Sequence, residues 1–258
     1  MNNRLPISSI LEALNSLSPT FHLVGEGNTA AEIENFRAQL GLALPPAYED
    51  FLATVGATPG LKLLRDADFS TAAVLEGLEV DKTVRGELLP VAYEQTFMNP
   101  EFITLGLGPL AGARTDDPRV FFTYTDELVR GHTGRLISEQ FSRFVAVGLV
   151  EWMVCPSFRY MKTFIPQISL KYVQICKVVD IDHIVSCEFL KLGYSQILAE
   201  HTLPIYRRDG RDVAVAAYNR CPKDHAFTLS VGSDDRGEIA RVHSALSAIL
   251  KTQLNEAP

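Results

Sequence analysis

Residues 29–55 (TAAEIENFRAQLGLALPPAYEDFLATV) constrain the fold more than any other stretch of the chain. Thr29 is a helix-capping residue, and Glu32 follows three positions later, which is the spacing of a capping box. Gly41 stands where a helix C-cap favours a residue that can take positive φ. The apolar residues between these two ends keep helical spacing: Ile33, Phe36 and Leu40. The sequence therefore predicts a helix with one apolar face.

A second helix is expected directly after it. Pro45 and Pro46 prevent the first helix from continuing, and Pro46 suits the first turn of a new helix because its missing N–H would be unpaired there. Gly56 marks the expected end of this helix. The residues on its predicted apolar face are Tyr48, Phe51, Leu52 and Val55. Two short helices with facing aromatic residues are expected to pack on each other.

These two helices resemble the signature of the SUKH superfamily, which includes fungal cell-wall-assembly regulators and bacterial immunity proteins that neutralise polymorphic toxins. The matching residues are Glu32-Ile33-Glu34, Leu40-Gly41, Leu44-Pro45, Tyr48 and Phe51-Leu52. Residues 102–112, 120–127 and 137–149 are similar to the strand and glycine loop, the next strand and the closing helix of that family. The resemblance covers residues 29–154. It implies an antiparallel sheet flanked by helices.

With 258 residues, the chain has room for two modest domains. Cys155-Pro156 interrupts the helical pattern after Trp152, so we predict domains at 1–155 and 156–258. The second is expected to contain a helix, three antiparallel strands and a helix, at residues 183–199, 203–208, 213–218, 226–231 and 237–254. Asp209-Gly210 is a hairpin turn signal between the first two strands. Residues 169–179 fit either a strand pair or a helix. The predicted fold class is α+β.

Further elements are expected in the first domain. Residues 5–18 predict an amphipathic helix, residues 21–24 a short strand, and residues 138–149 a helix. Residues 101–107 and 120–124 predict strands. Residues 65–91 are charged, with a helix capped near Ser70, and they fit either a solvated excursion or part of an acidic recognition face.

The charge is unevenly distributed. Residues 1–155 hold 11 Lys/Arg and 20 Asp/Glu, a net charge of −9. Residues 156–258 hold 13 Lys/Arg and 11 Asp/Glu, a net charge of +2, and the two values add to the −7 of the whole chain. An acidic domain repels phosphate, which argues against a nucleic-acid partner and favours a basic protein. A merely solubilising surface is the alternative. The residues expected to bind the partner are Asp116, Asp117, Asp126 and Glu127.

No catalytic motif stands out, and we expect no enzyme activity and no cofactor. The glycines at 106, 108 and 112 lack a following P-loop lysine, so they are interpreted as turn formers. His183, Cys187, Cys221 and His225 are donor types that zinc prefers. However, Cys187 lies on a predicted apolar stripe with Ile184 and Leu190, so we expect packing and no bound metal.

Arginines gather around the predicted hairpin, at Arg207, Arg208, Arg211 and Arg220. A salt-bridged surface is favoured over a nucleic-acid patch because aspartates are interspersed with them. No apolar run reaches membrane-spanning length, and four scattered cysteines suit the cytoplasm. The family resemblance implies an immunity protein that sequesters a basic, nuclease-type toxin. The alternative is a regulatory scaffold of the cell-wall-assembly-regulator type.

Overall fold

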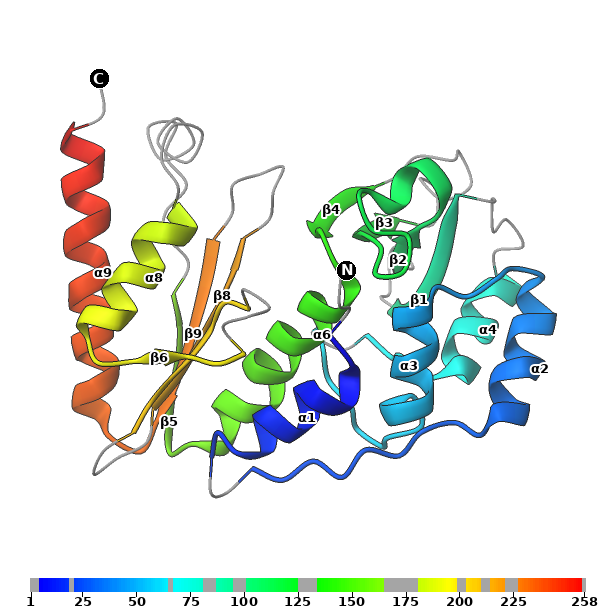
Figure 1. Cartoon of the computed structure of the whole chain (residues 1–258), viewed down its shortest axis with the longest axis horizontal. Coiled ribbons are helices and arrows are strands. Elements are labelled where there is room, and N and C mark those ends of the chain that lie inside the picture. The colour runs from blue at the N-terminus through cyan, green and yellow to red at the C-terminus, as the bar shows by residue number, and fades with distance from the viewer. Residues whose placement is uncertain are drawn as a thin grey trace. The chain divides into compact units, whose positions relative to one another are not determined.

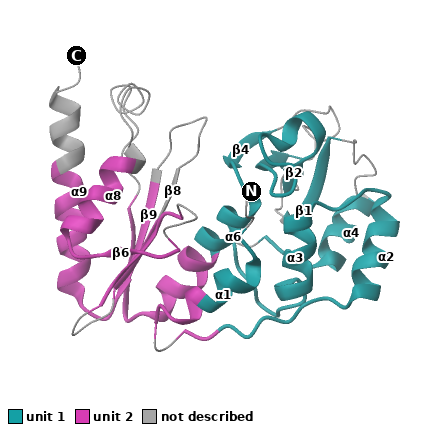
Figure 2. Cartoon of the chain, viewed as in Figure 1, with its two compact units in different colours: residues 1–12, 23–148 teal, residues 13–22, 149–258 magenta. Residues whose placement is uncertain are grey.

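The computed structural model describes residues 5–18, 21–64, 67–80, 87–94, 101–124, 134–164, 181–198, 203–209, 214–220 and 227–256. The chain divides into two compact units, which Figure 2 shows in different colours. The first unit holds residues 1–12 and 23–148, and the second holds residues 13–22 and 149–258. Helices and antiparallel sheets occur as separate elements, so the predicted α+β class is confirmed. The predicted boundary at 155/156 lies a few residues after this division.

The two helices expected in residues 29–55 are present in the first unit as α2 (Ala30–Leu40) and α3 (Pro46–Val55). The capping box is confirmed: the Thr29 hydroxyl accepts from the Glu32 amide at 3.3 Å, and the Glu32 carboxylate accepts from the Thr29 amide at 2.7 Å. Gly41 ends α2 with a φ of 65°, a conformation that costs other residues energy. The two helices pack on each other.

The sheet of the first unit is antiparallel, in the order β1-β2-β3-β4 (Figure 1). Its strands are β1 (Leu88–Glu94), β2 (Glu101–Gly106), β3 (Val120–Tyr124) and β4 (Arg135–Ser138). Strands β2 and β3 match the prediction, whereas β1 lies largely in the charged stretch. Strand β4 includes Ser138, where the helix was expected to begin, and the helix begins at Phe141. The 3-10 helix η1 (Gly108–Ala111) connects β2 towards β3, with positive φ at Gly108 and Gly112.

Helix α4 (Thr71–Val80) packs on β1. Gly77 permits this approach, because a Cβ atom there would lie 2.7 Å from the Tyr93 ring and 3.0 Å from Phe102. Helix α6 (Phe141–Leu149) contributes Phe141, whose ring meets Tyr48 and Phe51 edge-on at centroid distances of 5.7 and 5.4 Å. Such aromatic pairs each add about 1 kcal/mol beyond burial.

The second unit contains an antiparallel sheet in the order β5-β9-β8-β7-β6. Its strands are β5 (Tyr160–Phe164), β6 (Ser195–Gln196), β7 (Ile205–Arg208), β8 (Ala214–Arg220) and β9 (Phe227–Ser233). Its long helices are α8 (Ile181–Lys191) and α9 (Arg236–Glu256). The helix–three strands–helix order is confirmed, and β5 and β6 are additional edge strands. The segment at 169–179 lies outside the described residues.

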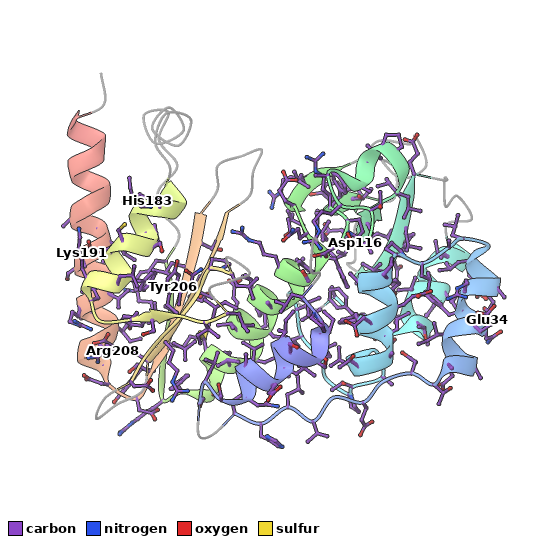
Figure 3. All side chains as sticks on the ribbon, in the orientation of Figure 1. Glu34, Asp116, His183, Lys191, Tyr206 and Arg208 are labelled. Atoms are coloured by element: carbon purple, nitrogen blue, oxygen red, sulfur yellow. The ribbon has the colours of Figure 1, made fainter. Side chains whose placement is uncertain are left out.

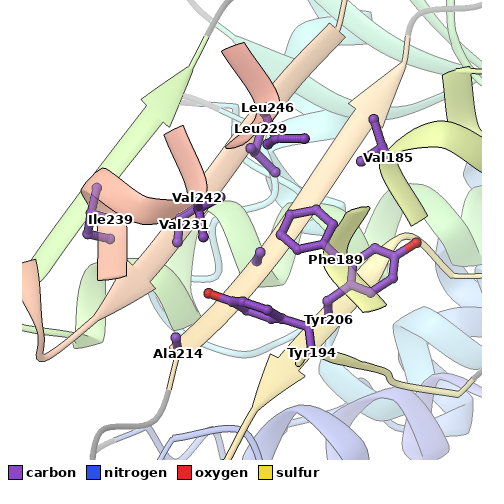
Figure 4. Close-up of a cluster of buried hydrophobic side chains, with 11 residues drawn as sticks. Val185, Phe189, Tyr194, Tyr206, Ala214, Leu229, Val231, Ile239, Val242 and Leu246 are labelled. Carbon is purple, nitrogen blue, oxygen red and sulfur yellow. The ribbon is translucent and has the colours of Figure 1, made fainter. Parts of the chain in front are cut away.

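The core of the second unit corrects the predicted orientation of α8. Val185 and Phe189 are buried on the sheet, and the Phe189 ring stacks on Tyr206 at 4.6 Å (Figure 4). The predicted inward stripe is not buried: Leu190 is 56% exposed, and Ile184 and Cys187 are half-buried. Helix α8 thus has two apolar stripes. The one through Val185 and Phe189 faces the core, where Phe189 stacks on Tyr206 of β7.

Helix α1 (Ile7–Asn15) has buried leucine and isoleucine side chains, as its pattern predicts. Residues 21–24 form no strand, so that prediction is wrong. After α6, the chain continues through a π-helical turn, Val150–Val154, and a 3-10 turn, Cys155–Ser157. None of the helices within the described residues is long and apolar enough to span a membrane.

Candidate functional site

The predicted partner-binding residues begin in the loop between η1 and β3, where Asp116 lies at the surface (Figure 3). Its side chain is 41% exposed and forms an ion pair with Arg114 at 3.3 Å. The Asp116 carbonyl accepts a 2.9 Å hydrogen bond from the Ala47 amide in the first turn of α3. The backbone of this loop is therefore held in place, while the Asp116 carboxylate remains accessible to a partner.

Asp117 does not belong to this surface, which corrects the sequence-based assignment. Its side chain is fully buried and accepts from the Ser142 amide at 2.8 Å and from the Ser142 hydroxyl at 2.6 Å. Ser142 lies in the first turn of α6, so Asp117 satisfies a free donor at that helix end. Burial raises the pKa of Asp117, although the bonds from Ser142 and the charge of Arg114 act in the opposite direction. This carboxylate has a structural role.

The other two predicted residues, Asp126 and Glu127, lie outside the described residues. Elsewhere in the first unit, exposed carboxylates are distributed over several elements. Arg37 of α2 binds Glu34 at 2.7 Å and also binds Glu49 of α3, so these three side chains form one ion-pair group. Glu76 and Glu79 are exposed on α4. The acidic excess therefore extends well beyond the loop that carries Asp116.

A hollow of about 430 Å³ lies in the first unit between the end of α3 and the start of α4. Its charged lining residues are Lys62 and Asp68, one of each sign. The Asp68 carboxylate accepts from the Ser70 amide at 2.8 Å, and the Ser70 hydroxyl accepts from the Ala73 amide at 3.2 Å. These two side chains are therefore engaged at the start of α4. The Pro59-Gly60 turn signal could have indicated the loop but not the hollow.

The arginines near the β7–β8 hairpin form internal ion pairs in the second unit. Arg207 binds Asp209 at 2.7 Å and donates to the Ser16 carbonyl. Arg208 binds Glu238 at 2.8 Å. Arg211 lies outside the described residues, as does the side chain of Arg220. Both described arginines therefore form ion pairs, as predicted, but only the Arg207–Asp209 pair lies at the surface, because Glu238 is buried.

Glu238 is the centre of a buried polar network that sequence reasoning missed. Only 3% of its side chain is exposed. It accepts from the Tyr194 hydroxyl at 2.7 Å and from Arg241 at 2.8 and 2.9 Å, in addition to its ion pair with Arg208. Burial alone would raise the pKa of Glu238, but the bonds from Arg241 and Tyr194 hold it below its usual value. Each charge has a partner, so the network fits a structural role.

His183 and Cys187 lie one helical turn apart on α8. The Cys187 sulfur is 3.5 Å from His183 Nε2 and 3.9 Å from Nδ1. The other two members of the sequence-based metal set, Cys221 and His225, lie outside the described residues. Within the part of the chain that the structure describes, no three His, Cys, Asp or Glu side chains gather into a metal-binding group.

Comparison with known proteins adds no relative from which a site could be transferred. No family model matches the chain, and no match is found among curated proteins or solved structures. The resemblance to the SUKH superfamily therefore stays a prediction from the sequence.

Proposed function

We propose that the chain is a non-enzymatic binding protein whose acidic first unit captures a basic protein partner. In its specific form, the partner is a basic, nuclease-type toxin, and the chain is a SUKH-type immunity protein that sequesters it. Binding would be stoichiometric and would proceed by electrostatic capture followed by occlusion of the toxin surface.

The observation that carries this proposal is the charge of the accessible side chains in the first unit. Exposed carboxylates occur on α2, α4 and the loop after η1, represented by Glu34, Glu79 and Asp116. The ion pairs with Arg37 and Arg114 neutralise only part of this charge. A field of one sign attracts a basic partner and accelerates its association.

The test is affinity capture from the source cells with the tagged full chain, with parallel washes at low and high salt. One basic protein retained at low salt, released at high salt and identified as a nuclease or another toxin would support the proposal. Its toxicity should be suppressed by co-expression of this chain at a one-to-one ratio. Recovery of cell-envelope or signalling proteins only would contradict the immunity role and favour the regulatory scaffold.

A further inference from the structure

The strongest unassigned pair of metal-binding side chains is His183 and Cys187 on α8. Imidazole and thiolate are donors that Zn²⁺ prefers, and thiolate selects thiophilic ions over Mg²⁺ or Ca²⁺. The sequence places Cys187 on an apolar stripe that was expected to face the core. In the structure, however, the buried face of α8 carries Val185 and Phe189, and Cys187 is only half-buried.

The distance between the two donor atoms matches a chelate. A zinc ion about 2.3 Å from sulfur and about 2.0 Å from nitrogen, with a tetrahedral angle between them, places the two donors about 3.5 Å apart. The Cys187 Sγ to His183 Nε2 distance is 3.5 Å, but Sγ is also 3.9 Å from Nδ1, so the sulfur faces the imidazole ring and does not lie along the Nε2 lone pair. Rotation of the imidazole about its side-chain bonds would direct the Nε2 lone pair to an ion shared with Sγ, without a change in the helix backbone, since i and i+4 side chains lie on one face.

The pair is accessible from solvent. His183 is exposed and Cys187 is half-buried. Two carboxylates adjoin the pair in the helix sequence: Glu188 is paired with Lys191 at 3.3 Å, and the side chain of Asp182 lies outside the described residues. Among the described residues no third donor joins the pair.

We propose that His183 and Cys187 form a two-residue chelate for a single thiophilic divalent ion of the zinc type. Binding replaces the thiol proton: Cys–SH and M²⁺ give Cys–S⁻–M²⁺ and a proton released to the buffer. His183 contributes the lone pair of Nε2. This site is independent of the proposed partner-binding role, because it lies in the second unit and involves none of the acidic residues of the first.

Cobalt titration of the metal-free full chain under reducing conditions tests the site. Co²⁺ reports thiolate ligation through a sulfur-to-metal charge-transfer band in the near ultraviolet. The wild type should show this band, Cys187→Ser should lose it, and His183→Ala should weaken binding by about tenfold or more. His243→Ala is the matched control, since it removes an exposed imidazole from α9 and should leave the titration unchanged.

A second measurement uses the wild type alone and avoids any effect of substitution on folding. Added Zn²⁺ should slow alkylation of Cys187 by iodoacetamide, as mapped by mass spectrometry. Three results would overturn the site: no charge-transfer band in the wild type, a full band in Cys187→Ser, or a Cys187 alkylation rate that does not change with Zn²⁺. Unchanged affinity in His183→Ala would also overturn it.

Discussion

Asp117 illustrates how the role of one carboxylate depends on its surroundings. Neighbouring Asp116 is exposed, whereas Asp117 binds two donors of Ser142 in the interior. Asp117→Ala leaves the Ser142 amide without its partner, so we expect a loss of about 1–2 kcal/mol in the free energy of unfolding. Urea denaturation measures this loss. Asp116→Ala is the control and should cost less than about 0.5 kcal/mol; equal losses in both variants would contradict the capping role.

Glu151 gives a prediction about pH. Burial raises its pKa, and a hydrogen bond from the Ser230 hydroxyl at 3.3 Å acts in the opposite direction. A carboxyl whose pKa is raised in the folded state stabilises most below its unfolded pKa of about 4.3, and this contribution is lost as the pH rises through the folded pKa. Glu151→Gln cannot ionise there. The free energy of unfolding of Glu151→Gln should therefore increase relative to that of the wild type as the pH rises from 4 to 8.

The measurement for Glu151 is urea denaturation of both proteins at matched pH values. The difference between their unfolding free energies isolates the titration of this one group, because the other ionisable groups are shared. A difference that stays constant over the whole range would show that Glu151 ionises in the folded protein as it does in the unfolded chain.

At the scale of elements, the start of α9 depends on the network around Glu238. Glu238→Ala would leave two guanidinium groups and the Tyr194 hydroxyl without their common acceptor. Because the Arg241 side chain is 40% exposed and can hydrate, the loss should stay below that of a fully buried ion pair, at about 2–3 kcal/mol, and appear as a lower urea midpoint. Tyr194→Phe removes one neutral donor and should cost about 1.5 kcal/mol. A similar small loss in both variants would show that the arginines find other partners.

Local signals predicted the elements whose causes lie within a few residues. The capping box of α2 joins Thr29 to Glu32, and Gly41 ends the same helix, so both are visible in the sequence. The orientation of α8 was not predictable, because two apolar stripes share that helix and the choice depends on Tyr206. The buried role of Asp117 was equally hidden, since its partner Ser142 is 25 positions away.

At the scale of the whole molecule, the two units are not simply consecutive pieces of chain. Residues 13–22 belong to the second unit, where Ser18 bonds to Ser157 at 3.3 Å and the Ser16 carbonyl accepts from Arg207. The same unit begins at residue 149 and includes Glu151, which the Ser230 hydroxyl bonds. A domain defined by sequence as 156–258 therefore lacks two of its own segments.

We expect fragment 156–258 to unfold without a cooperative transition, whereas the full chain should unfold cooperatively. Circular dichroism during urea titration distinguishes the two outcomes. A longer fragment, 149–258, together with a peptide of residues 5–22, provides the control and should recover part of the transition. Sharp, high-midpoint unfolding of 156–258 alone would show that the missing segments contribute little.

Charge reversal tests whether the proposed partner recognises a place on the first unit or only its overall field. Asp116→Lys, Asp126→Lys and Glu127→Lys together change the net charge by +6, from −7 to −1. The triple variant Glu34→Lys, Glu76→Lys and Glu79→Lys makes the same change at exposed helix positions. If residues 116, 126 and 127 form the contact, the first variant should raise the dissociation constant of the captured partner by at least tenfold more than the second. Because salt screens long-range fields within about 10 Å at 0.1 M, the effect of the second variant should fade at high salt and the difference between the variants should remain. Isothermal titration calorimetry at two salt concentrations measures both effects, and equal losses in the two variants would leave a general acidic field as the only basis for binding.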